Sequence, residues 1–184
     1  MQKSYENGNY KEAEPKSISI LSDEVLSWLR DDLASSAYPS VVLSHHSLIE
    51  SRTSIGNAEE FRSALKDSPF GVLISICGHE HVDRLDECDG TYYLCLNSLS
   101  YYWAGSKYNH TTYGAELEDD YPSLRNVFPY RDPLFATVEI SDGEIRIFGR
   151  ASCIVGDTPE SLEFTKTGLV DPITASIQDR VLRI

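Results

Sequence analysis

Hydrophobic residues recur along this chain at two spacings, one typical of helices and the other of buried strands. Val25, Leu29 and Leu33 are four positions apart and predict an amphipathic helix that Ser22 can cap at its start. The same spacing predicts a shorter helix over residues 58–66. Both segments therefore have one apolar face that must pack against another element.

Two short apolar runs, residues 41–43 and 72–77, lie on either side of the second predicted helix. Runs of this length, rich in β-branched residues, predict buried strands. A strand, a helix and a second strand with short connections favour parallel neighbours in a layered α/β fold. We therefore expect these two strands to be adjacent in one sheet.

The downstream half of the chain has the pattern of hairpins. The pair Asp89-Gly90 predicts a tight turn followed by a strand over 91–97, and residues 135–148 predict a second hairpin. Between them, residues 98–132 are irregular and rich in tyrosine, so we expect a packed lid or pocket wall. Residues 155–184 are polar and are expected to wrap the surface.

The composition fits one globular domain and argues against two classes of binding partner. The chain has 184 residues, and 41% of them are hydrophobic. Its formal net charge of −13 argues against binding to nucleic acid or to an anionic membrane through a basic surface. No apolar stretch approaches membrane-spanning length, and the first residues lack a signal-peptide pattern. We expect a cytoplasmic protein whose four cysteines are reduced thiols.

Four of the five histidines fall into two tight clusters, each directly after a predicted buried strand. The clusters are His45-His46 and the pair His79 and His81. Ligand sites form at the carboxyl ends of parallel strands, and residues two apart in an extended segment project to the same side. Neutral imidazole is a common ligand of Zn, Mn and Fe, so these clusters predict a metal site. His110 has no such partner and is expected to be an ordinary core or surface side chain.

Both clusters lie in segments with recognisable motifs. Residues 41–48 resemble the penultimate motif of the calcineurin-like metallophosphoesterases, in which hydrophobic residues precede His-His-Pro or His-Ser-Pro. Residues 76–81 resemble the final Gly-His-x-His motif of that superfamily, and the gap of 34 residues between His45 and His79 is similar to the family's. The resemblance covers about residues 18–150, with Ser47 standing where proline is usual.

The resemblance implies a fold, a cofactor and an activity. The fold is a layered α/β metallophosphoesterase-type β-sandwich with flanking helices, and the activity is hydrolysis of phosphate mono- or diesters at a two-metal centre. The metals would be divalent Mn, Fe or Zn. By the resemblance, His45 and His79 bind one ion and His81 binds the other. His46 is not a usual ligand position and would contact the substrate phosphate or pack beside the site.

The motifs that the superfamily carries upstream are missing here. No Asp-x-His, Gly-Asp-x-x-Asp or Gly-Asn-His-Asp/Glu segment precedes His45. The chain therefore resembles only the C-terminal half of such a domain, with a tail at 1–16, the domain portion at 17–150 and an extension at 151–184. We expect mainly one of the two sheets, with an exposed apolar face where a missing N-terminal half or a second chain docks.

Two alternatives follow from the incomplete motif set. The chain could be a non-catalytic metal-binding or interaction module derived from such an enzyme, or one member of a complementing pair. The aromatic residues of the irregular stretch could line a substrate pocket or could pack beneath it. These residues are Tyr101, Tyr102, Trp103 and Tyr108.

Overall fold

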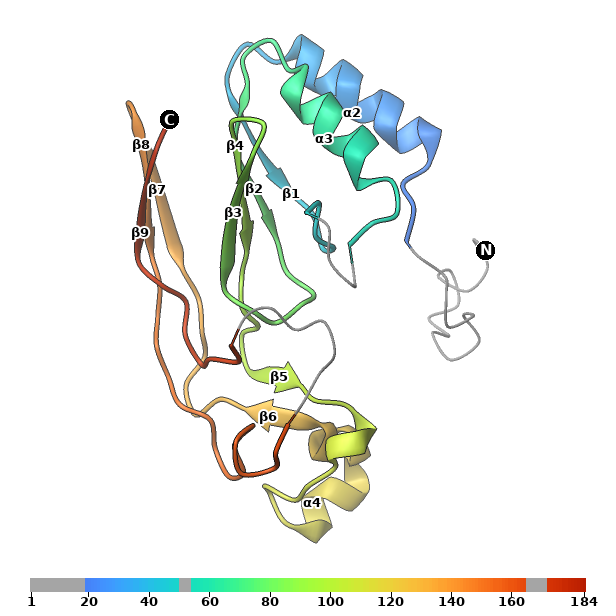
Figure 1. The fold of residues 1–184 in the computed structure, drawn as a ribbon, viewed down its shortest axis with the longest axis vertical. Coiled ribbons are helices and arrows are strands. Elements are labelled where there is room, and N and C mark those ends of the chain that lie inside the picture. The colour runs from blue at the N-terminus through green and yellow to red at the C-terminus, as the bar shows by residue number, and fades with distance from the viewer. Residues whose placement is uncertain (1–18, 50–53, 165–171) are drawn as a thin grey trace.

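The computed structural model describes residues 19–49, 54–164 and 172–184. These residues form three layers and a smaller lobe (Figure 1). A three-stranded sheet faces a four-stranded sheet, and two helices cover the other face of the four-stranded sheet. The smaller lobe lies beyond one end of the layers. The expected mixed α/β architecture is therefore present.

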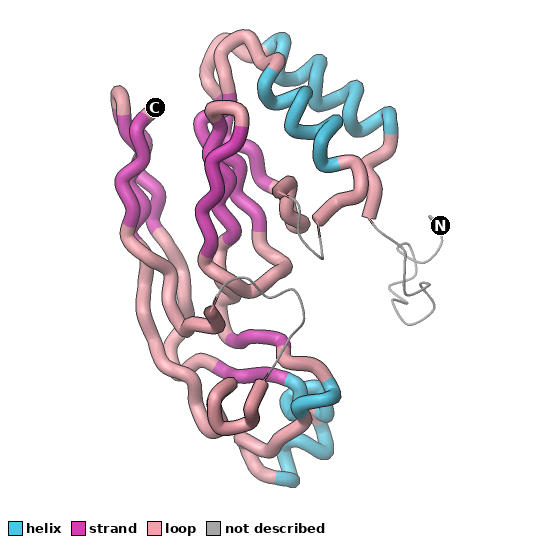
Figure 2. Tube along the Cα trace, viewed as in Figure 1, coloured by secondary structure: helices cyan, strands magenta, loops and turns pink. Residues whose placement is uncertain are grey.

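The two helices begin and end where the sequence pattern predicts. Helix α2 is Asp23–Ser35, and the Ser22 hydroxyl accepts a hydrogen bond from the Val25 N–H at 3.3 Å. This cap satisfies one of the N–H groups that a helix start leaves without a partner. Helix α3 is Ala58–Lys66. Figure 2 shows the two helices lying side by side on one side of the sheets.

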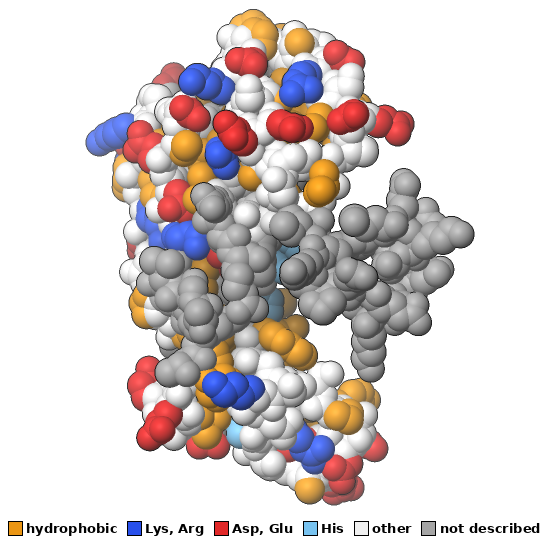
Figure 3. Space-filling model, turned by 45° about the vertical axis from the view of Figure 1, so that its right-hand side comes forward, with side chains coloured by type: hydrophobic (Ala, Val, Ile, Leu, Met, Phe, Trp, Pro, Cys, Tyr) orange, Lys and Arg blue, Asp and Glu red, His pale blue; other side chains and the backbone are white. Residues whose placement is uncertain are grey.

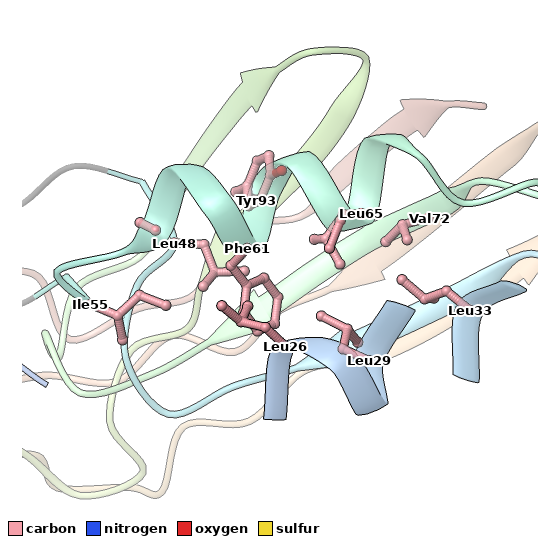
Figure 4. Packing of buried hydrophobic residues seen from close by; sticks show 11 residues of the cluster. Leu26, Leu29, Leu33, Leu48, Ile55, Phe61, Leu65, Val72 and Tyr93 are labelled. Atoms are coloured by element: carbon pink, nitrogen blue, oxygen red, sulfur yellow. The ribbon is translucent and has the colours of Figure 1, made fainter. Parts of the chain in front are cut away.

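The helices bury their apolar stripes against each other and the sheet. Figure 4 shows Leu26, Leu29 and Leu33 of α2 close to Phe61 and Leu65 of α3, and all five side chains are buried. Full burial of an aliphatic or aromatic side chain of this size stabilises the folded state by about 1.5–3 kcal/mol. The two helices therefore pack on the face of the four-stranded sheet that points away from the three-stranded sheet.

The larger sheet confirms the predicted parallel pair. Strand β1 (Ser40–Leu43) pairs in parallel with β2 (Val72–Cys77), which pairs in parallel with β4 (Thr91–Cys95). Strand β3 (Arg84–Cys88) adds an antiparallel edge through the turn at Asp89-Gly90. The order is β1-β2-β4-β3, so the segments that follow β1 and β2 leave the same edge of the sheet.

The smaller sheet corrects two expectations. Strands β7 (Thr137–Ser141) and β8 (Glu144–Phe148) form the predicted hairpin, and β9 (Arg180–Arg183) pairs with β8. The chain thus contributes to both layers of the sandwich rather than mainly to one. The last strand also comes from the segment expected to wrap the surface. The side chains buried between the layers are Ile74, Leu94, Ile145, Ile147 and Leu182.

The stretch expected to be a lid or pocket wall is a folded lobe. It contains β5 (Tyr101–Trp103) paired with β6 (Val127–Pro129), the 3₁₀ turns η1 (Ser106–Tyr108) and η2 (Pro122–Asn126), and helix α4 (Ala115–Asp120). In the described part of the chain, no helix has the length and apolar character needed to cross a membrane.

A buried carboxylate organises that lobe. Glu118 is fully buried and accepts hydrogen bonds from the N–H groups of Thr112 and Tyr113 at 2.7 and 2.8 Å. Arg125 adds an ion pair at 3.3 Å. These contacts hold the pKa of the Glu118 carboxyl below its usual value, chiefly through the backbone donors. The lobe therefore has fixed internal contacts of its own.

Candidate metal centre

The two predicted histidine clusters meet because their strands are neighbours in parallel. His45 and His46 follow β1 after one residue, and His79 follows β2 after Gly78. The Gly78 N–H donates to the His45 carbonyl oxygen at 3.1 Å, which extends the β1–β2 pairing into the two loops. The backbone thus places both clusters at the carboxyl edge of the larger sheet.

Three imidazole rings gather at this edge. The Nε2 atom of His45 lies 3.1 Å from the Nδ1 atom of His79, and the ring centroid of His46 lies 4.1 Å from that of His79. Two nitrogens bound to one tetrahedral Zn²⁺ at 2.0–2.1 Å would be about 3.3 Å apart. The spacing of His45 and His79 therefore fits two ligands of one transition-metal ion.

His81 has a different neighbour. Its ring packs against Tyr101 of the smaller lobe, with ring centroids 5.1 Å apart. Within residues 19–49, 54–164 and 172–184, no group of three or more His, Cys, Asp or Glu side chains is arranged to hold a metal ion. The structure therefore brings two of the three predicted ligands together, and the assignment of His81 to a second ion stays a prediction.

The backbone of the second cluster is strained. His79 and His81 have φ values of 65° and 57°, in the left-handed region that residues other than glycine rarely occupy. Each such residue costs on the order of 1–3 kcal/mol and persists when the surrounding structure holds it in place. Strain of this kind concentrates at functional sites, which supports a role for this turn beyond packing.

The environment of His79 favours its neutral form. Burial and then the neighbouring imidazoles lower the pKa of His79 to about 4, although Glu80 acts in the opposite direction. The ring is therefore uncharged at neutral pH, and a lone pair is available for a metal ion. The three histidines that lower this pKa are His46, His45 and His81.

The same depressed pKa predicts that acid destabilises the fold. The pKa of His79 is about 4 in the folded chain and near 6.5 in an unfolded one, so the unfolded state binds the extra proton first. The free energy of unfolding should fall as the pH drops from about 6.5 to about 4. Urea unfolding across this range, compared with a His79→Gly variant, checks this. An identical pH slope in the two proteins would contradict it.

An ion pair ties the turn after His81 to the last strand. The Nη1 and Nη2 atoms of Arg180 donate to the Asp83 carboxylate, at 2.9 and 2.8 Å, and the Gln178 N–H donates to it at 2.8 Å. The Asp83 side chain is 3% exposed. This contact links β9 to the histidine-bearing turn, and the sequence pattern alone gave no sign of a contact across 97 positions.

The buried side-chain amide of Asn97 also links distant segments of the chain beside the site. The Asn97 side chain accepts hydrogen bonds from the Tyr130 hydroxyl and the Ser98 N–H, and it donates to the Thr174 and Ser176 carbonyl oxygens. It follows β4, the third parallel strand of the larger sheet. All of these contacts are internal, so Asn97 joins β4 to the smaller lobe and the C-terminal segment.

Two of the remaining sequence candidates are packed side chains. His110 is buried and stacks on Phe128, with ring centroids 5.2 Å apart, so it is a core histidine. Tyr102 is also buried and packs against Phe164. Trp103 is partly exposed. Figure 3 shows histidine side chains in the recess between the helix-bearing end of the molecule and the lobe.

Comparisons with known proteins give a distant structural neighbour. No family model matches this chain, and no curated protein matches it. Among solved structures, a dimetal phosphatase from Danio rerio is similar with a TM-score of 0.46 and 16% sequence identity. The similarity covers 73% of this chain and 38% of that chain. The chain thus spans well under half the length of that phosphatase.

Proposed function

We propose that this chain carries part of the active site of a metal-dependent phosphoesterase, in which His45 and His79 bind a divalent Mn, Fe or Zn ion. The observation that carries this proposal is the 3.1 Å approach of the two ring nitrogens at the ends of adjacent parallel strands. The strained backbone and depressed pKa of His79 support it. So does the resemblance of both histidine motifs to the calcineurin-like phosphoesterases.

Each histidine has a distinct task in this proposal. A divalent ion at such a site supplies Lewis-acid chemistry toward a phosphoryl oxygen and lowers the pKa of bound water. His45 and His79 hold the ion in their neutral forms. His46, whose ring is 4.1 Å from that of His79, donates an N–H to a phosphate oxygen. In this proposal, His81 binds a second ion.

A complete two-metal site needs carboxylate ligands in addition to these histidines. Neutral imidazoles alone leave the charge of two divalent ions uncompensated, and no carboxylate joins His45 and His79 in a metal-binding group of the described chain. We therefore propose that an N-terminal half or a second chain adds the carboxylate ligands. A metal-binding module without catalysis is the second candidate, and the same lack of a three-ligand group favours it.

Calorimetric titration of the 184-residue chain with Mn²⁺ and with Zn²⁺ tests the proposal. We expect weak binding of one ion, its loss in a His45→Ala variant, and its retention in a His110→Asn variant that folds by circular dichroism. His46→Ala should keep the ion and weaken binding of inorganic phosphate. Equal affinity in the wild type and His45→Ala would contradict the proposed ligands.

Hydrolysis separates the two candidates. The chain alone should hydrolyse p-nitrophenyl phosphate and bis-p-nitrophenyl phosphate negligibly, because no carboxylate joins the paired histidines in a metal-binding group of the described residues. Hydrolysis should appear when a polypeptide bearing the upstream motifs is joined to the chain or added to it. Metal binding without hydrolysis in that complete form would favour the non-catalytic module.

A further inference from the structure

The larger sheet has an open edge at β1. In the described part of the chain, β1 pairs with β2 on one side, and the sheet order ends there. Ser40 and Ser44 donate their N–H groups toward the β2 side, at 3.1 and 3.0 Å. Because backbone groups alternate in direction along a strand, Val41 and Leu43 present theirs to the open edge. An edge of this kind is a template for another strand.

The second layer of the sandwich also stops short of β1. Val41 is in register with Ile74, and Leu43 with Ile76, so each pair shares one face of the sheet. Ile74 is fully buried, whereas Val41 is 42% exposed and Leu43 is 75% exposed. The β7-β8-β9 sheet therefore covers β2 and leaves the apolar side chains of β1 uncovered.

An apolar groove follows this open edge. It has a volume of about 470 Å³, and its lining includes α2, β1, residues 19–21 and Phe61 of α3. Trp28 lines it from α2 and is 61% exposed, although large apolar side chains are usually buried. At its other end the groove reaches His45 and His46. It is thus continuous with the proposed metal site.

The outer side of α2 carries acidic side chains next to the groove. A shallow hollow beside Trp28 is lined by Glu24, Asp31 and Asp32, with Ser27 and Ser35. These acids have no ion pair within the described residues that could neutralise them, and the chain as a whole carries a formal net charge of −13. A partner that carries Lys or Arg at this place complements the surface.

We propose that β1 accepts a β-strand from a partner polypeptide, paired in parallel, with alternating apolar side chains and a basic flank. The apolar side chains cover Val41 and Leu43, the other face of the strand lies beside Trp28, and the basic residues face the outer side of α2. Main-chain hydrogen bonds to an open edge supply affinity, and alternate side chains supply specificity.

The parallel direction follows from the site and rests on the proposed function. Strands β1, β2 and β4 run in parallel, and the histidine clusters follow the first two. A partner strand in the same direction ends beside His45, so the residues after it can bring carboxylates to the metal. A second copy of this chain placed by two-fold symmetry would pair β1 antiparallel and bring two acidic α2 surfaces together.

A synthetic peptide probes the groove directly. The probe is acetyl-Lys-Lys-Val-Thr-Val-Thr-Val-Gly-Asp-amide, and binding is followed by the fluorescence of Trp28 in a Trp103→Phe background. We expect saturable binding with a blue shift, because the peptide covers an exposed indole. A peptide with proline in place of the first threonine should bind at least tenfold more weakly, since the threonine N–H groups face the edge and proline has none.

Matched variants locate the binding. Leu43→Lys should weaken peptide binding at least tenfold, whereas Ile140→Lys on β7, where Ile140 is 47% exposed, should not change it. Equal binding of the proline peptide, no effect of Leu43→Lys, or no binding at all would overturn the docking proposal. Dimerisation in sedimentation equilibrium that Leu43→Lys abolishes, without peptide binding, would also overturn it in favour of a second copy.

Metal titration separates this inference from the proposed function. Mn²⁺ should bind more tightly in the presence of the aspartate peptide than with an otherwise identical asparagine peptide. Peptide binding without that difference would leave the docking edge in place and count against the parallel placement and the metal site. If the metal ion binds but the peptide does not, the docking proposal is rejected and the proposed metal site stands.

Discussion

Replacing His79 by glycine should remove metal binding without weakening the fold. The imidazole supplies one of the two nitrogens that lie 3.1 Å apart, so its loss leaves one ligand and should lower Mn²⁺ affinity at least 100-fold. Glycine adopts a φ of 65° without steric cost. The free energy of unfolding should therefore stay unchanged or rise by up to about 1 kcal/mol. Calorimetry and urea unfolding measure the two effects.

The alanine variant is the matched control for this prediction. His79→Ala also removes the ligand, but its Cβ keeps the strain of the left-handed backbone. It should lose metal to the same extent and be less stable than His79→Gly. Retention of Mn²⁺ binding by the glycine variant would refute the assignment of His79 as a ligand. Equal stability of the two variants would show that the backbone relaxes after substitution.

Replacing Arg180 by alanine should cause a large loss of stability. The change leaves the Asp83 carboxylate, 3% exposed, without its charge partner. Removing one member of a buried pair costs about 3–5 kcal/mol, because the other charge stays desolvated. The midpoint of urea unfolding should fall accordingly, and the turn that carries His81 should exchange its amide hydrogens faster.

Arg183 on the same strand provides the comparison. Its side chain is 79% exposed and pairs with Glu144 at 2.8 Å. Exposed pairs contribute about 0–1 kcal/mol, so Arg183→Ala should change stability little. A double Asp83→Leu, Arg180→Met variant should recover part of the loss, because no buried charge remains. Similar losses for Arg180→Ala and Arg183→Ala would contradict the buried-pair interpretation.

The local elements were predictable because their signals are local. Helix α2 follows from a four-residue apolar spacing and a capping serine, and the β7–β8 hairpin from alternation around a turn. The parallel pairing of β1 and β2 follows from a short helix between two apolar runs. That pairing was sufficient to predict that His45 and His79 meet.

The missed features depend on partners far along the chain. Strand β3 has the sequence Arg-Leu-Asp-Glu-Cys, whose polarity hides a strand that is fixed by pairing with β4. Strand β9 forms because Leu182 is buried against β8, where its register partner Ile145 lies 37 positions away. The contact of His81 with Tyr101 likewise depends on where the lobe folds back. Such long-range packing overrides local propensity.

The late position of β9 bears on the order in which the molecule assembles. The larger sheet and its helices use residues 23–95, so they can form while the ribosome is still adding the rest of the chain. The Tyr92 hydroxyl, by contrast, bonds the Arg183 carbonyl across 91 positions. Contacts at such separations close slowly, because the loop entropy is lost before they form. During synthesis the inner face of the larger sheet is therefore exposed until the β7-β8-β9 sheet covers it. A chaperone that acts at this stage would bind that face.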